Sequence, residues 1–136
     1  MKKKLWVLII PILIIAVFLC IIIFQANRVN MNFAKEAEVC FIHGDTDILQ
    51  LLDEDELESL KTLFNGKKMY KDDPSCGFSE NVSIKFNKAQ TFCIAQDTCP
   101  IIYWKEENRY IKLSEEEKIQ LYNLLKPYGF IFPCIQ

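Results

Sequence analysis

The side chains best suited to chemistry in this sequence are its cysteines. Five of the six follow an apolar N-terminal stretch, and these are Cys40, Cys76, Cys93, Cys99 and Cys134. Outside the cytoplasm such thiols are often oxidised in pairs, and a bridge that closes a long loop stabilises a small domain by about 2 to 4 kcal/mol. Spacing alone does not fix the pairing. We favour Cys93 with Cys99 as a local closure and Cys76 with Cys134 as a tie to the C-terminus, which leaves Cys40 unpaired.

Two kinds of activity compete with this structural interpretation. A zinc site would draw on Cys76, Cys93, Cys99, Cys134 and His43, but structural zinc and thiol redox sites usually contain a close Cys-x-x-Cys pair, and the sequence has none. A cysteine nucleophile would need His43, the only histidine, as its base. Buried free thiols, packed as small hydrophobic groups, are a further interpretation. The sequence therefore predicts no catalytic residue, no metal and no cofactor.

A long apolar stretch defines the N-terminal part of the chain. Residues 5–24 contain no charged side chain and follow three lysines. About 20 helical residues cross the roughly 30 Å hydrocarbon core of a bilayer, whereas the apolar part of a signal peptide has about 7 to 15 residues before its cleavage site. Acylation of Cys20 would need a small residue before it, and Leu19 stands there. We predict a retained transmembrane helix, with cleavage or lipidation at Cys20 as alternatives.

The flanking charges predict the orientation of this helix. Lysine and arginine resist translocation, and the three lysines of residues 1–4 outnumber the lone Arg28 beyond the helix. Residues 1–4 are therefore expected in the cytoplasm, 25–37 as a juxtamembrane stalk, and 38–136 as one domain outside the cell membrane. The preference for lysine over arginine is typical of A+T-rich bacterial genes.

The pattern from residue 38 onward predicts a mixed α+β domain. Strands are expected where short apolar or alternating segments are separated by turn residues, at 38–43, 48–52, 82–86, 92–94, 101–104 and 109–113. Residues 67–80 show no periodicity and are expected to form a loop. Apolar residues at the C-terminus should pack back against the sheet.

Two helices are expected, one after the second strand and one after the last. Asp53 with Glu56 and Ser114 with Glu117 fit the capping-box pattern at their starts. The expected buried stripes are Leu57, Leu60 and Phe64 in the first helix and Ile119, Tyr122 and Leu125 in the second. The order predicts an N-terminal transmembrane helix followed by a small, mostly antiparallel sheet with both helices on one face.

Charge narrows the possible partners. The chain carries a net charge of −2 at pH 7, and three of its positive charges precede the apolar stretch, so the predicted domain is more acidic than the whole. It has no basic stretch suited to a phosphate backbone, and we expect no nucleic-acid partner. Acidic runs at the starts of both helices are explained by the helix dipole. We expect a membrane protein with a non-catalytic domain that binds a protein or peptide, or that serves a larger membrane complex.

Overall fold

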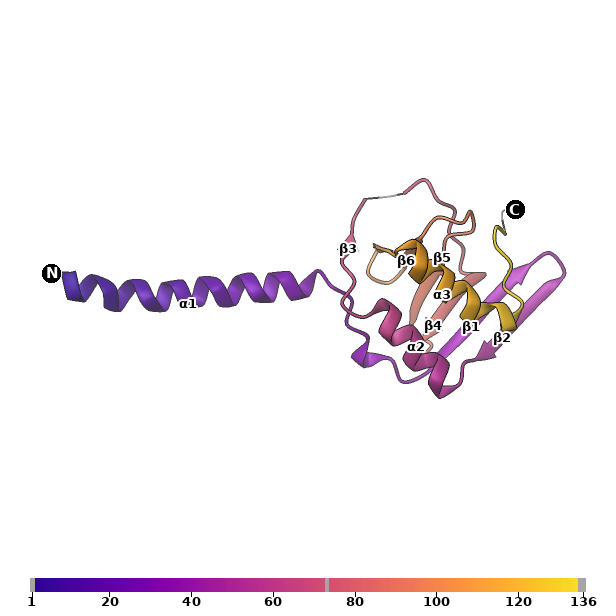
Figure 1. Ribbon diagram of the computed structural model, residues 1–136, viewed down its shortest axis with the longest axis horizontal. Helices are drawn as coiled ribbons and strands as arrows, with labels where there is room; N and C mark the ends of the chain where they lie inside the picture. Colours follow the sequence, from indigo (N-terminus) through magenta and orange to yellow (C-terminus); the bar gives the residue numbers. More distant parts are fainter. Residues whose placement is uncertain (1, 73, 135–136) are drawn as a thin grey trace.

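The computed structural model describes residues 2–72 and 74–134 and contains an apolar helix attached to a mixed α+β domain. Helix α1 projects from the domain as an extended rod, while α2 and α3 lie on the sheet (Figure 1). The helices are α1 (Lys2–Ala26), α2 (Glu54–Phe64) and α3 (Glu115–Leu125), with short 3-10 turns η1 (Met31–Phe33) and η2 (Lys126–Tyr128). The strands are β1 (Ala37–His43), β2 (Thr46–Leu51), β3 (Met69–Tyr70), β4 (Val82–Phe86), β5 (Gln90–Ile94), β6 (Ile101–Trp104) and β7 (Arg109–Lys112).

The seven strands form one sheet in the order β2-β1-β4-β5-β6-β7-β3, and every neighbouring pair is antiparallel. Most neighbouring strands are consecutive in the chain and form hairpins. The exceptions are β1, which pairs with β4 although β2, α2 and β3 lie between them in the sequence, and β3, which pairs with β7 at the far edge. The predicted α+β class, with two helices and a mostly antiparallel sheet, is confirmed. The two-residue strand β3 lies within the segment expected to be a loop.

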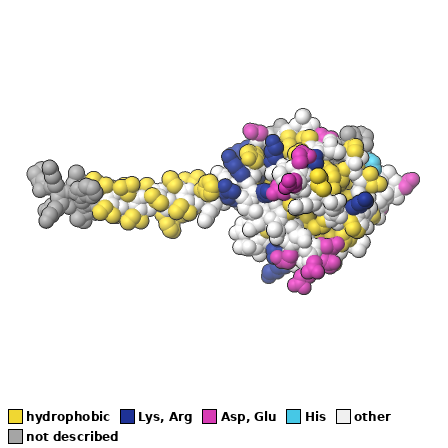
Figure 2. All heavy atoms as spheres, viewed as in Figure 1, with side chains coloured by type: hydrophobic (Ala, Val, Ile, Leu, Met, Phe, Trp, Pro, Cys, Tyr) yellow, Lys and Arg dark blue, Asp and Glu magenta, His cyan; other side chains and the backbone are white. Residues whose placement is uncertain are grey.

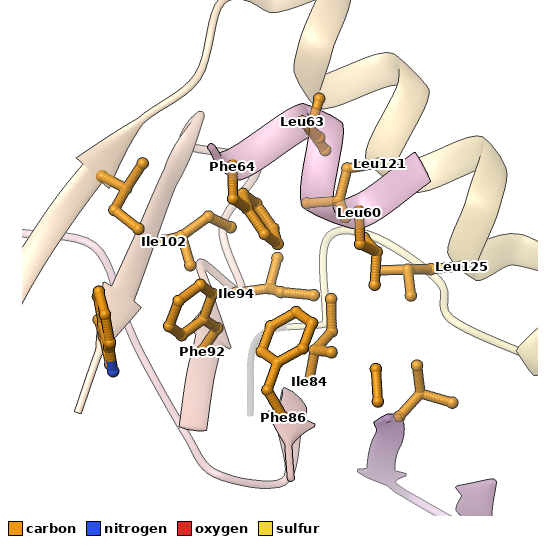
Figure 3. Packing of buried hydrophobic residues seen from close by; sticks show 14 of the residues in the cluster. Leu60, Leu63, Phe64, Ile84, Phe86, Phe92, Ile94, Ile102, Leu121 and Leu125 are labelled. Carbon is orange, nitrogen blue, oxygen red and sulfur yellow. The ribbon is translucent and has the colours of Figure 1, made fainter. Parts of the chain in front are cut away.

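The core lies between the sheet and helices α2 and α3 (Figure 3). Phe64 of α2 contacts Phe92 edge-to-face, with ring centroids 5.4 Å apart, and Phe92 contacts Phe86 in the same way at 5.1 Å. Such aromatic pairs add about 0.5 to 1.5 kcal/mol beyond the area that they bury. Leu121 and Leu125 of α3 are also buried in this core. They are four residues apart and therefore lie on the same side of the helix.

Both predicted capping boxes are present. Asp53 accepts a hydrogen bond from the backbone of Glu56 while Glu56 accepts one from the backbone of Asp53, and Ser114 and Glu117 repeat the arrangement. The predicted stripe of the second helix is partly wrong. Ile119 is 55% exposed, because the face of α3 toward the sheet carries Leu121 and Leu125 instead.

The segment predicted as a stalk contributes to the domain. Val29 and Met31 are buried in the core. The backbone of Val29 also exchanges two hydrogen bonds of 2.8 Å with Gly66 and Lys67, just after α2. These contacts fix the point at which α1 leaves the domain.

Candidate functional site

Cys76, Asp97 and Cys99 meet where two loops come together. Cys76 lies in the loop between β3 and β4, whereas Asp97 and Cys99 lie in the turn between β5 and β6. Their two sulfur atoms and a carboxylate oxygen all lie within 4.8 Å of one another, and all three residues are half-buried. We call these three residues the thiol cluster.

Backbone hydrogen bonds hold the two loops of the thiol cluster together. The N–H of Gln96 donates to the carbonyl of Gly77 at 3.0 Å, which fastens the turn to the residue after Cys76. Within the turn, the N–H of Cys99 donates to Asp97 Oδ1 at 3.2 Å. Lys118 of α3 donates to the carbonyl of Thr98 at 3.2 Å, so the turn is also fixed to the helix layer. Both sulfur atoms are therefore positioned by the fold.

The thiol cluster favours a protonated Cys99. A hydrogen bond with the Cys76 thiol, partial burial and a hydrogen bond with Asp97 raise the pKa of Cys99 to about 12. The thiolate is the reactive form of cysteine, so a raised pKa makes Cys99 a slow nucleophile near neutral pH. The arrangement is suited to a structural bond or a bound cation more than to rapid thiol catalysis.

The C-terminal segment lies against the same turn. Cys134 donates its backbone N–H to the carbonyl of Gln96 at 2.9 Å and is 1% exposed. Tyr122 of α3 stacks on Phe132, with ring centroids 4.2 Å apart. Burial, followed by the nearby Cys134 and Asp97, raises the pKa of Tyr122 to about 12. The predicted return of the C-terminal residues to the sheet is confirmed, because Phe130 is 4% exposed and its ring lies 4.6 Å from that of Phe41 in β1. Residues 135–136 lie outside the described part of the chain.

Cys40 and Cys93 lie elsewhere, on the face of the sheet opposite the helices. In the strand register Cys40 pairs with Ser83, and Ser83 pairs with Cys93, so the serine separates the two thiols. Burial raises the pKa of Cys93 to about 11 and also raises that of Cys40. Both thiols therefore pack as small uncharged groups.

The structure thus brings together Cys99 from the predicted pair Cys93–Cys99 and Cys76 from the predicted pair Cys76–Cys134. All cysteines are free thiols in it, so the pairings Cys93 with Cys99 and Cys76 with Cys134 stay predictions, and so does the unpaired Cys40. Sequence reasoning missed Asp97. Its position two residues before Cys99, in a turn, was the available signal.

The two other sequence candidates are His43 and the acidic residues that begin α2. His43 ends β1, and its ring lies 6.1 Å from that of Phe41. The acidic residues Glu54, Asp55 and Glu56 form the first turn of α2, where the helix dipole favours negative charge. Figure 2 shows acidic side chains gathered at the lower edge of the domain, near this turn.

Strand β2 presents a second candidate surface. It lies at the edge of the sheet, with only β1 beside it. Ile48 packs against the core, whereas Leu49 and Leu51 point to the other face and are 61% and 54% exposed. Exposed leucines on an unpaired edge are uncommon, because such edges recruit further strands. We call β2 with these two leucines the β2 edge.

Helix α1 is the most exposed apolar element. Its stretch Ile9–Ala26 has a mean hydropathy of 3.0, and none of it is buried against the domain. Hydrophobic side chains cover the part of the rod that Figure 2 draws in colour. The structure therefore defines an α+β domain carried on one N-terminal apolar helix, compatible with a single-pass membrane protein or a signal anchor. Comparisons of the chain with protein-family models, curated proteins and solved structures gave no match.

Proposed function

We propose that this chain is a single-pass membrane protein whose domain lies outside the cytoplasm and binds an extended segment of a partner protein. The observation that carries the proposal is the wholly unburied apolar stretch Ile9–Ala26. A helix of this composition in water would leave its apolar surface exposed, and a bilayer removes that cost. The three lysines before it support a cytoplasmic N-terminus.

The β2 edge supports the binding role. An extended peptide that added an eighth strand would satisfy the outer backbone groups of β2, and its alternate side chains would cover Leu49 and Leu51. Asp45 and Asp47 lie at one end of this strand and Asp53 and Glu54 beyond the other, all exposed. A segment that alternates apolar residues with lysine or arginine fits this surface.

Topology is tested with reporters at the C-terminus of the full chain. Alkaline phosphatase folds only outside the bacterial cytoplasm and green fluorescent protein fluoresces only inside it. The proposal predicts an active phosphatase fusion and a dark fluorescent fusion. The reverse result would place the domain in the cytoplasm and refute the proposed orientation.

Binding is tested by selecting phage-displayed peptides on the full-length protein in detergent micelles. We expect enriched peptides with alternating apolar and basic residues, and loss of their binding to the variant Leu49→Lys, Leu51→Lys. Ile119→Lys is the matched control, since Ile119 is similarly exposed but lies on α3. Equal binding to both variants would exclude the β2 edge.

A second candidate function rests on the thiol cluster. Two sulfur atoms and a carboxylate oxygen within 4.8 Å of one another offer three ligands for a soft divalent metal. Structural zinc usually takes four protein ligands, and a catalytic site takes three with water in the fourth position. Activity that depends on zinc, and that is lost in both Cys76→Ser and Cys99→Ser, would support this alternative over a binding domain.

A further inference from the structure

The two thiols of the thiol cluster are already in contact. Cys76 and Cys99 share a hydrogen bond between their side chains. A backbone hydrogen bond between Gln96 and Gly77 joins the two loops that carry them. A disulfide needs sulfur atoms about 2.05 Å apart on residues whose Cα atoms lie roughly 4.4 to 6.8 Å apart. The two sulfur atoms lie within 4.8 Å of each other, so bond formation needs an approach of less than about 3 Å.

Exposure separates this pair from the other cysteines of the domain. Cys76 and Cys99 are half-buried, whereas Cys40, Cys93 and Cys134 are at most 4% exposed. Thiol–disulfide exchange requires the attacking sulfur and the oxidant to meet, so access decides which thiols react. An oxidant in solution reaches the thiol cluster first.

We propose that Cys76 and Cys99 form the disulfide bond of this domain. This inference draws on the proposed function in one respect, because a position outside the cytoplasm supplies the oxidising compartment. The oxidant is a disulfide of a thiol-oxidising protein or of a small thiol. One domain cysteine attacks it as the thiolate, forms a mixed disulfide and releases one thiol. The thiolate of the second cysteine then attacks the mixed disulfide, forms the Cys76–Cys99 bond and displaces the remaining half of the oxidant. The two domain thiols lose two protons, and the oxidant's disulfide becomes two thiols.

The bond would fix the long loop between β3 and β4 against the sheet. Phe78, two residues after Cys76, packs its ring 5.7 Å from those of both Tyr103 and Tyr110. Tyr103 pairs with Cys93 in the strand register, on the face opposite the helices. The loop therefore lies over this face, and the Cys76–Cys99 bond ties it to the turn after β5. Without the bond, as in the free-thiol structure, the loop is held by the Gln96–Gly77 hydrogen bond and by the ring contacts of Phe78.

The test is a disulfide map of the full-length protein in detergent micelles. The protein is reduced, freed of reductant, incubated with oxidised glutathione, quenched with acid, alkylated and digested for mass spectrometry. We expect the Cys76–Cys99 crosslink as the dominant product. Cys76→Ser and Cys99→Ser should each abolish it, and Cys40→Ser, the matched buried control, should form it at the same rate.

Several results would overturn this proposal. Dominant Cys93–Cys99 or Cys76–Cys134 crosslinks would restore the pairing predicted from sequence, and a stable glutathione adduct would show that the two sulfurs do not meet. One equivalent of zinc, bound through Cys76 and Cys99 and blocking oxidation at micromolar metal, would make the cluster a metal site. This assay does not depend on which side of a membrane the domain occupies, so its failure is separate from failure of the topology test.

Discussion

Two arginines placed in the middle of α1 should abolish its insertion into a membrane, whereas one should not. Thirteen large hydrophobic side chains between Ile9 and Phe24 are exposed along the helix. Each favours insertion by about 0.3 to 0.6 kcal/mol near the bilayer centre, which gives about 4 to 8 kcal/mol in total as an upper bound. Each arginine costs about 2.5 to 3.5 kcal/mol and also removes the contribution of the residue that it replaces.

The insertion free energy of the single variant Val17→Arg therefore stays negative, at about −5 to 0 kcal/mol, whereas Leu13→Arg with Val17→Arg raises it to about −2 to +4 kcal/mol. The assay is flotation of the full chain with membranes after alkaline carbonate extraction, in which aggregates sink. The single variant should float like the wild type, and the double variant should lose most of its floating fraction. The control, Glu107→Arg with Asn123→Arg, places two arginines on exposed positions of the domain and should float. If the double variant floated as well as the control, α1 would not be the anchor.

Three further predictions concern the domain. Phe92→Ala should lower the free energy of unfolding by about 3 to 5 kcal/mol in urea titrations, because the ring is wholly buried; a loss below about 1 kcal/mol would contradict the core. Asp97→Asn should speed oxidation of the cluster at pH 7 severalfold, since the carboxylate helps to raise the pKa of Cys99; an unchanged rate would contradict that role. The hydrogen bond from Lys67 lowers the pKa of Glu117, so the pair stabilises the fold fully above pH 4.5 and less as the pH falls further. In the variant Glu117→Gln the urea midpoint of unfolding should therefore fall less steeply below pH 4.5 than in the wild type. Equal pH dependence in the two proteins would refute the pair.

The parts of the fold that were predictable from sequence are those encoded locally. The capping boxes at Asp53 and Ser114 need only residues three apart, and both formed as expected. The alternation of Val82, Ile84 and Phe86 marks a strand with one face in the core, and all three are buried. The two-residue period of a strand and the three-residue spacing of a capping box can both be recognised in the sequence without knowledge of the tertiary structure.

The parts that were not predictable depend on contacts between distant segments. Strand β3 has two residues, too few for any periodicity, and exists only because β7 pairs with it. The buried face of α3 shifted from Ile119 to Leu121, since the helix has apolar residues on more than one side and packing chose between them. The meeting of Cys76 with Cys99 also depends on how two loops approach, which spacing along the chain does not specify.

The most direct test of the central claim, a retained membrane anchor, is the intact mass of the protein extracted from membranes. A retained and unmodified α1 predicts the full chain at 15.9 kDa, apart from processing of the initiating methionine. Loss of the apolar stretch would show that it is a cleaved signal, and a lipid on Cys20 at a new N-terminus would show a lipoprotein. Either result would contradict the single-pass account.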